Sequence, residues 1–279
     1  MKILRALAAA ALLAGTSHAE EKPPVNAGPY VPSPQSVVSD MLKYADVGPA
    51  DFVIDLGSGD GRIVLTAAKV FGARGFGVEI QDHLVQLSNE AARKEGLAER
   101  VRFVKQDLFK TDISQATVLT MYLLPNTVNM LKDKLLAELR PGTRIVSHDY
   151  PLAGWLPEKY AQFDLEDKVA ISGVTTTLIY LYVVPAKVGG SWNAKLPAKI
   201  ARAPVRLELK QQVTRISGSA RLDGKEVSLT DAHLKGAEFR FRLGASNAWY
   251  TGTVKGEAIE GTVEGGGVAK AAWSATLAK

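Results

Sequence analysis

A glycine-rich turn flanked by acidic residues is the strongest chemical signal in the chain. The apolar segment 52–56 ends in Asp55-Leu56 and runs directly into Gly57-Ser58-Gly59-Asp60-Gly61, after which a helical pattern begins. Glycines at alternate positions permit a tight turn and let a ligand approach the main chain closely. The start of the following helix offers amide donors and a partial positive charge, which suit a carboxylate. These features predict a cofactor site at the end of segment 52–56.

The residue after this turn distinguishes between classes of cofactor. A dinucleotide fingerprint requires a further glycine three positions after the second one, at position 62, where this chain has Arg62. S-adenosylmethionine (SAM) differs from NAD in carrying an ammonium group and no pyrophosphate. The acidic residues Asp55 and Asp60 would complement that ammonium group. We therefore expect SAM, and not NAD, as the ligand.

Two more acidic residues follow the next predicted strands. Glu79 ends the second strand, some 22 positions after Gly57, where a carboxylate can accept hydrogen bonds from both ribose hydroxyls. Asp107 follows the third strand and could accept a hydrogen bond from an adenine amino group, with Ile80 and Leu108 on either side of the ring. Each acidic residue alone is typical of a solvated strand end or a helix cap. At the tips of consecutive strands, together with the glycine turn, they predict a cofactor site.

The elements that would position these residues alternate between short apolar runs and longer helical segments. This alternation predicts an α/β fold, a Rossmann-like class I methyltransferase sheet that is parallel with one antiparallel hairpin strand. The expected parallel strands are 52–56, 75–80, 101–106, 117–123 and 144–148. The expected helices are 35–45, 61–71, 82–95 and 126–139. A hairpin of strands 163–171 and 175–184, joined by Ser172-Gly173-Val174, would complete the sheet.

The composition changes after residue 184. Residues 185–204 contain Gly189-Gly190, Pro197 and Pro204 without periodicity, which predicts a linker. Short alternating segments broken by glycine then predict a small all-β meander or barrel of about six strands over residues 205–279. The SAM-binding domain is accordingly expected over residues 20–184.

The N-terminus has the pattern of an export signal. Lys2 and Arg5 precede an apolar run at 6–14, and Ser17-His18-Ala19 provides small residues three and one positions before a cleavage point. We expect a signal peptide at 1–19, cleaved after Ala19, and a periplasmic or secreted protein; the alternative is membrane anchoring through an uncleaved segment. Removal of the signal would reduce the formal charge from +5 to 5 − 2 = +3, which does not imply a nucleic-acid partner. The chain has no cysteine, so disulfides and catalytic thiols are excluded.

Other candidate residues carry weaker signals. Tyr122 and Pro125 follow the fourth strand and are candidates for a substrate channel, although Tyr122 is nearly as typical of ordinary packing. His83, His148 and His233 are too scattered to predict a metal site, and core or surface packing explains them. No residue stands out as a general base.

Several stretches together carry a resemblance to a known family: 28–32 (Gly-Pro-Tyr-Val-Pro), 55–64, 77–79, 105–108 and 131–135. With these stretches, residues 28–157 resemble the lysine methyltransferases that modify the mitochondrial ATP synthase c-subunit and the adenine nucleotide translocase. The resemblance implies SAM as methyl donor, Glu79 on the ribose, Asp107 near the adenine, and the segment around Tyr30 folded over the cofactor or substrate channel. The export signal and the C-terminal β domain are departures from that family.

Two functions follow from these observations. The first is a SAM-dependent methyltransferase that N-methylates lysine of a protein substrate, by similarity an envelope or membrane protein, with the β domain recruiting the target or another partner. The second is an exported protein that binds SAM or a nucleoside without transferring a methyl group. The catalytic residues and the methyl acceptor are not fixed by the sequence.

Overall fold

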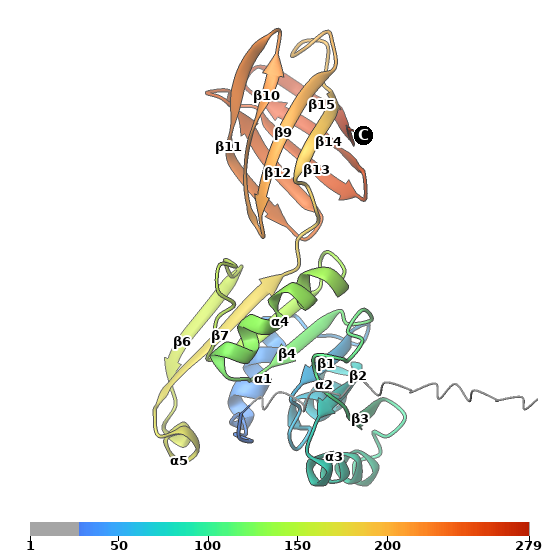
Figure 1. The fold of residues 1–279 in the computed structure, drawn as a ribbon, viewed down its shortest axis with the longest axis vertical. Coiled ribbons are helices and arrows are strands. Elements are labelled where there is room, and N and C mark those ends of the chain that lie inside the picture. The colour runs from blue at the N-terminus through green and yellow to red at the C-terminus, as the bar shows by residue number, and fades with distance from the viewer. Residues whose placement is uncertain (1–27, 279) are drawn as a thin grey trace, which may run out of the picture.

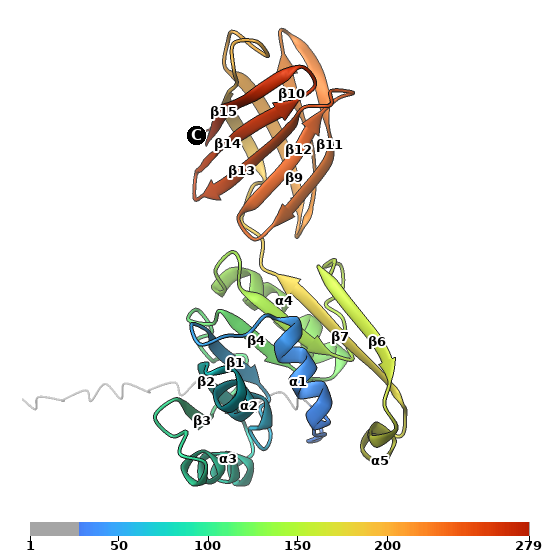
Figure 2. The ribbon, with the colours of Figure 1, turned by 180° about the vertical axis from the view of Figure 1, so that it is seen from behind.

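The computed structural model describes residues 28–278, which form an open α/β sheet and a closed β-barrel (Figure 1). The predicted signal peptide, residues 1–19, lies outside the described residues. The barrel follows the sheet in the chain and lies beyond one end of it (Figures 1 and 2).

The first part of the chain contains a sheet of seven strands in the order β3-β2-β1-β4-β5-β7-β6. Strands β1 to β5 pair in parallel, and β7 pairs antiparallel with both β5 and β6. The strands are β1 Phe52–Leu56, β2 Arg74–Glu79, β3 Val101–Lys105, β4 Val118–Met121, β5 Arg144–His148, β6 Lys159–Asp164 and β7 Thr176–Val183. This arrangement confirms the predicted α/β class with its antiparallel hairpin strand.

Helices cover both faces of the sheet (Figures 1 and 2). Helix α4 packs on one face, and α1, α2 and α3 pack on the other, because each helix has a stripe of buried apolar residues. The four helices are α1 Gln35–Tyr44, α2 Arg62–Phe71, α3 Asp82–Lys94 and α4 Pro125–Glu138. Within residues 28–278, no helix has the length and hydropathy needed to span a bilayer.

The hairpin differs from the prediction in its first strand. Strand β6 ends at Asp164, whereas we expected a strand over 163–171; residues after it form the short helices η1 (Glu166–Lys168) and α5 (Val169–Ser172). Gly173, with φ 78°, closes α5 before β7 begins. The apolar residues at 169–171 therefore belong to a helical turn that the period-two pattern did not reveal.

The C-terminal part is an antiparallel barrel of eight strands, which confirms the predicted all-β class but exceeds the expected six strands. The strands are β8 Gly190–Lys195, β9 Val205–Gln212, β10 Arg215–Leu222, β11 Lys225–Lys235, β12 Glu238–Leu243, β13 Trp249–Lys255, β14 Ala258–Gly265 and β15 Val268–Leu277. β8 lies inside the predicted linker 185–204 and pairs with both β9 and β15, which closes the barrel. Its own pattern is short, with only Trp192 and Ala194 buried.

Aromatic side chains fill the barrel interior. The rings of Phe241 and Tyr250 stack with their centroids 5.0 Å apart, and Trp273 meets both rings edge-on. Trp192 and Phe239 are buried in the same cluster. The barrel core is thus packed with side chains, and the chemistry predicted from the sequence lies in the α/β part.

Candidate functional site

A cavity of about 640 Å³ lies at the carboxyl ends of the parallel strands, where a ligand binds in open α/β sheets. The lead-in residues 28–33 form one of its walls. Eleven predicted site residues line it: Tyr30, Asp55, Gly57, Ser58, Gly59, Asp60, Glu79, Ile80, Asp107, Leu108 and Tyr122. The structure therefore brings together in one cavity residues that the sequence placed at four separate strand ends and in the lead-in segment.

Two predicted site residues do not line this cavity. Gly61 has φ 81° and precedes α2; a Cβ there would lie 2.6 Å from the ring of Phe103, so the glycine serves helix packing. Pro125 is the first residue of α4 and is exposed, whereas Leu123 takes a place in the cavity wall. A proline suits a first helical position because its missing N–H has no intrahelical partner there.

The glycine turn allows other groups to approach the main chain. A Cβ on Gly59, whose φ is 52°, would lie 2.4 Å from Cε2 of Tyr30, and one on Gly57 would lie 2.7 Å from Leu123. The amides of Gly57 and Ser58 both donate to the carbonyl oxygen of Val78, at 2.8 and 2.9 Å. These contacts fix the turn against β2, so its conformation is set before any ligand binds.

Glu79 lines the cavity and is held in place by main-chain donors. Its Oε1 accepts from the amides of Ile80 (2.8 Å) and Gln81 (2.9 Å), and its Oε2 accepts from Gly59 (3.0 Å). A carboxylate has about four lone-pair sites. Main-chain amides occupy three of these sites, which leaves a site on Oε2 for a ligand.

The two acidic residues of the turn differ in their charge environment. Asp60 forms an ion pair with Arg62, with Oδ2 2.6 Å from Nη2, and also accepts from the Arg62 amide at 3.2 Å. Burial opposes ionisation of Asp60, but the hydrogen bonds and charge of Arg62 prevail and lower its pKa. Asp55 is buried, accepts from the Thr120 hydroxyl at 2.7 Å, and has no cationic partner among the ion pairs of residues 28–278. Burial raises the pKa of Asp55 to about 7.

Asp107 follows β3, at the same edge of the sheet as Glu79. Its Oδ1 accepts from the amide of Phe109 at 2.8 Å, which fixes the direction of the carboxylate at the cavity wall. Leu108 is buried and Ile80 is exposed, and both line the cavity. Glu79, Ile80, Asp107 and Leu108 thus lie together at one edge of the sheet, and their contact with an adenosine group stays a prediction.

The lead-in segment is fastened across the cavity at Ser33. Its carbonyl oxygen accepts from Nη1 of Arg62 at 2.8 Å, and its hydroxyl lies 2.9 Å from Nδ1 of His148. The ring of Tyr30 lies against the glycine turn, since a Cβ on Gly59 would be 2.4 Å from it. These contacts connect residues 28–33 to both the glycine turn and the end of β5. The segment around Tyr30 therefore covers one side of the cavity.

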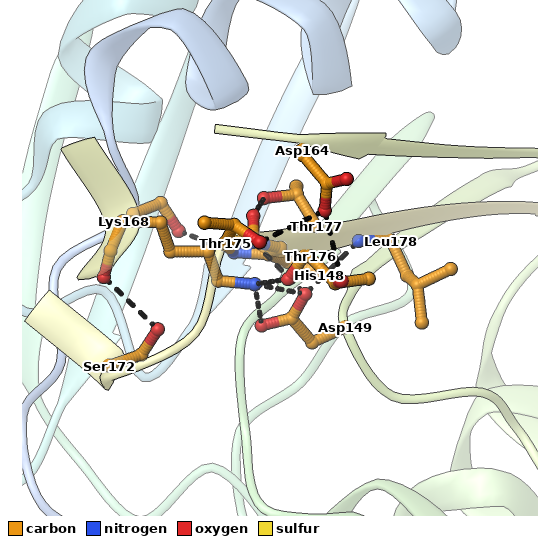
Figure 3. A network of polar contacts seen from close by, with 10 residues as sticks. His148, Asp149, Asp164, Lys168, Ser172, Thr175, Thr176, Thr177 and Leu178 are labelled. Carbon is orange, nitrogen blue, oxygen red and sulfur yellow. Dashed lines mark hydrogen bonds and ion pairs between the residues drawn. The ribbon is translucent and has the colours of Figure 1, made fainter. Parts of the chain in front are cut away.

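Sequence reasoning missed a polar network around Asp149, directly after β5 (Figure 3). Asp149 directly follows β5, and its carboxylate accepts two 2.7 Å hydrogen bonds from the buried amine of Lys168. The ring of Tyr122 packs on His148, with centroids 4.0 Å apart. The position of Asp149 after a parallel strand was the available signal, whereas Lys168 comes from the hairpin and had none. Within residues 28–278, no three His, Cys, Asp or Glu side chains are grouped to hold a metal.

Comparison with known proteins identifies the family to which the chain belongs. The chain is 46% identical over 157 residues to a protein-lysine N-methyltransferase of Saccharolobus islandicus (strain REY15A), an alignment that spans 56% of this chain and 93% of that protein. The chain belongs to the protein-lysine N-methyltransferase family. The family model "ANTKMT methyltransferase domain" matches residues 55–159 of this methyltransferase.

Two further matches are also described as methyltransferases. The ATP synthase c-subunit lysine N-methyltransferase of Xenopus laevis is 35% identical over 130 residues, which is 47% of this methyltransferase and 57% of that protein. A crystal structure described as an RNA methyltransferase from Salinibacter ruber in complex with S-adenosyl-L-homocysteine is 44% identical, with a TM-score of 0.51, over 57% of this chain and 96% of that one. The chain is a SAM-dependent methyltransferase, and these comparisons do not favour binding without transfer.

Proposed function

We propose that this methyltransferase transfers the methyl group of SAM to the side-chain amine of lysine in a protein, and that the cavity described above is its SAM site. The observation that carries the proposal is the convergence of the glycine turn, Glu79 and Asp107 in one cavity covered by the Tyr30 segment. Lysine as acceptor is supported by the relatives from Saccharolobus and Xenopus, whose names both specify it.

The acceptor positions in the cavity fit an adenosine group. Glu79 has one lone-pair site left and would accept one ribose hydroxyl. The Asp107 carboxylate, oriented by the Phe109 amide, would accept from the adenine amino group, and Ile80 and Leu108 would contact the ring. Each role follows from an acceptor or apolar surface that the main chain already holds in place.

The other end of the cavity fits the methionine part of SAM. Asp55 would face the ammonium group, because its carboxylate is buried there without a cationic partner, whereas Asp60 is paired with Arg62. The hydroxyl of Ser58 lines the cavity, is buried, and has no hydrogen-bond partner in the described structure, so it is available to a polar ligand. The cavity therefore has polar groups for both ends of the cofactor.

The chain's contribution to methyl transfer is alignment and exclusion of water. SAM, when bound, supplies a methyl group on a sulfonium, which already activates the leaving group. Residues 28–33 cover the cavity and limit access of water, while the strand ends hold the acceptor in line. Free lysine has a pKa of about 10.4, so the amine must lose its proton before it reacts, and desolvation in the covered cavity would favour that neutral form.

We further propose that the protein acts outside the cytoplasm on an envelope or membrane protein. The export pattern of residues 1–19 supports this location, and the target named for the Xenopus relative, the ATP synthase c-subunit, supports a membrane protein as acceptor. Sequencing the mature N-terminus from fractionated cells tests the location. We expect Glu20 in the periplasmic or secreted fraction; Met1 in the cytosol would refute export, and Met1 in the membrane fraction would indicate the anchored form.

Transfer activity is tested with purified residues 20–279, methyl-labelled SAM and an envelope-protein extract. The wild type should label protein, and Glu79→Ala should lose binding of S-adenosylhomocysteine and labelling together. Glu90→Ala, on the exposed side of α3, is the matched control and should retain both. Tight SAM binding by the wild type without any labelled protein would refute the proposed function.

A further inference from the structure

His148 is a buried polar residue that the proposed methyl transfer does not use. It ends β5, at the carboxyl edge of the sheet where the cavity lies, and its side chain is completely buried. Burying an imidazole costs free energy that an apolar ring of the same size would not, unless its nitrogens have partners. The contacts of the ring therefore indicate its role.

The His148 ring contacts two different walls of the cavity. Its Nδ1 lies 2.9 Å from the hydroxyl of Ser33, the last residue of the lead-in segment 28–33, and this contact is buried. The ring also packs on that of Tyr122, with centroids 4.0 Å apart. Ser33 and Tyr122 both line the cavity. His148 thus connects the segment before α1 with the loop after β4.

The direction of the hydrogen bond to Ser33 follows from the other ring nitrogen. Burial lowers the pKa of His148 to about 4, so the ring is neutral at pH 7 and has one donor and one acceptor nitrogen. Nε2 has no hydrogen-bond partner within residues 28–278, but it lies 3.5 Å from Oδ1 of Asp149, whose carboxylate is paired with Lys168 (Figure 3). A proton on Nε2 is attracted to that carboxylate, whereas a lone pair would be repelled. Nδ1 is therefore the acceptor, and the Ser33 hydroxyl donates to it.

The other end of the lead-in segment also contacts the loop after β4. Gly28 has φ 112°, and a Cβ there would lie 2.8 Å from Cγ of Leu124, so the main chain of Gly28 packs directly on that side chain. Between the two ends, the ring of Tyr30 lies against Gly59 of the glycine turn. The segment therefore crosses the cavity and is held at both ends.

We propose that His148 is a positioning residue, which holds residues 28–33 closed over bound SAM through the Ser33 hydroxyl. The inference rests on the proposed SAM site and is independent of the methyl acceptor. SAM would leave when residues 28–33 move away from the cavity, so loss of this hydrogen bond should speed its release. Because His148 also packs on Tyr122, it would hold the cover of the cofactor and the wall after β4 in one arrangement.

Release of methyl-labelled SAM from purified residues 20–279, started with excess unlabelled S-adenosylhomocysteine, tests the proposal. Ser33→Ala removes the hydroxyl but keeps the main-chain oxygen that accepts from Arg62. Loss of one hydrogen bond should raise the dissociation rate constant about fivefold. His148→Phe keeps a ring against Tyr122 and removes the acceptor, so it should have a similar effect. The double variant should also release SAM about fivefold faster, and not about 25-fold, because both changes remove the same bond.

Ser36→Ala is the matched control, because Ser36 is exposed on the first turn of α1. It should release SAM at the wild-type rate. Calorimetric titration with S-adenosylhomocysteine separates positioning from damage to the fold, since a damaged fold reduces the number of binding sites per molecule and a loosened cover does not.

Wild-type release by Ser33→Ala, or additive effects in the double variant, would overturn this inference and leave the proposed function intact. A reduced number of binding sites in Ser33→Ala, with wild-type release from the sites that remain, would also overturn it. Failure of the wild type to bind SAM would overturn both the inference and the proposed SAM site. If His148→Phe does not fold, Ser33→Ala alone decides the role of the hydrogen bond.

Discussion

Lowering the pH should weaken cofactor binding through a single buried carboxyl group. Burial raises the pKa of Asp55 to about 7, the Thr120 hydrogen bond opposes this shift, and the charge of Glu79 adds to it. Only the ionised form of Asp55 attracts the ammonium group of the ligand. Between pH 7 and pH 5.5 the ionised fraction falls from about one half to about 3%, so the apparent affinity should fall about 15-fold.

The assay is calorimetric titration with S-adenosylhomocysteine at both pH values. The α-amino group of the ligand has a pKa of about 8, so it remains protonated over this range and does not contribute to the change. Asp55→Asn retains an oxygen for the Thr120 hydroxyl and should bind the ligand more weakly at pH 7, with no further loss at pH 5.5. The control Asp40→Asn changes a partly exposed residue of α1 and should show the same pH dependence of binding as the wild type. An unchanged wild-type affinity, or a pH dependence that persists in Asp55→Asn, would refute the role of Asp55.

Three further predictions follow from the fold and the site. Gly59→Ala should weaken S-adenosylhomocysteine binding at least about tenfold, because the new Cβ would displace the ring of Tyr30 that covers the turn. The control Gly154→Ala is also at positive φ, but its Cβ would have no atom within 4 Å. It should bind normally and lose only about 1 kcal/mol of stability through backbone strain. Burial lowers the pKa of His148 to about 4, so between pH 4 and 6.5 the unfolded chain binds a proton that the native state lacks. The free energy of unfolding should therefore decrease as the pH falls through this range, by about 3 kcal/mol from His148 alone. Asp55 acts in the opposite sense, because its raised pKa makes the native state bind the extra proton. In His148→Phe, the free energy of unfolding measured with urea should therefore fall as the pH rises from about 4 to 7. A flat or rising profile would contradict this assignment. Phe241→Ala in the barrel core should cost about 3 to 5 kcal/mol in the free energy of unfolding, and a change below about 1 kcal/mol would contradict the packed interior.

The cofactor cavity could be predicted because its signals are local. The glycine turn, Glu79 and Asp107 lie at or just after the ends of short strands, and parallel strands place such ends at one edge of the sheet. Lys168 could not be predicted in the same way, because its contact with Asp149 depends on the helical turns between β6 and β7. These turns formed where the alternating pattern had favoured a longer strand.

The closing strand of the barrel was missed for a related reason. β8 has two buried residues, Trp192 and Ala194, between glycines and a proline, and such a short pattern is also typical of a loop. Its pairing with β15 joins residues 79 to 85 positions apart, which no local pattern encodes. The number of hydrogen-bond acceptor sites left free on Glu79 likewise depends on the amide of Gly59, whose direction is set by the folded turn.

The acceptor atom provides the most direct test of the central claim. Purified residues 20–279 would be incubated with methyl-labelled SAM and, in parallel, with envelope proteins or with total RNA, and the label identified after complete hydrolysis. The account predicts labelled methyl-lysine from the protein sample and no labelled nucleoside from the RNA. Label in a nucleoside and none in lysine would contradict it.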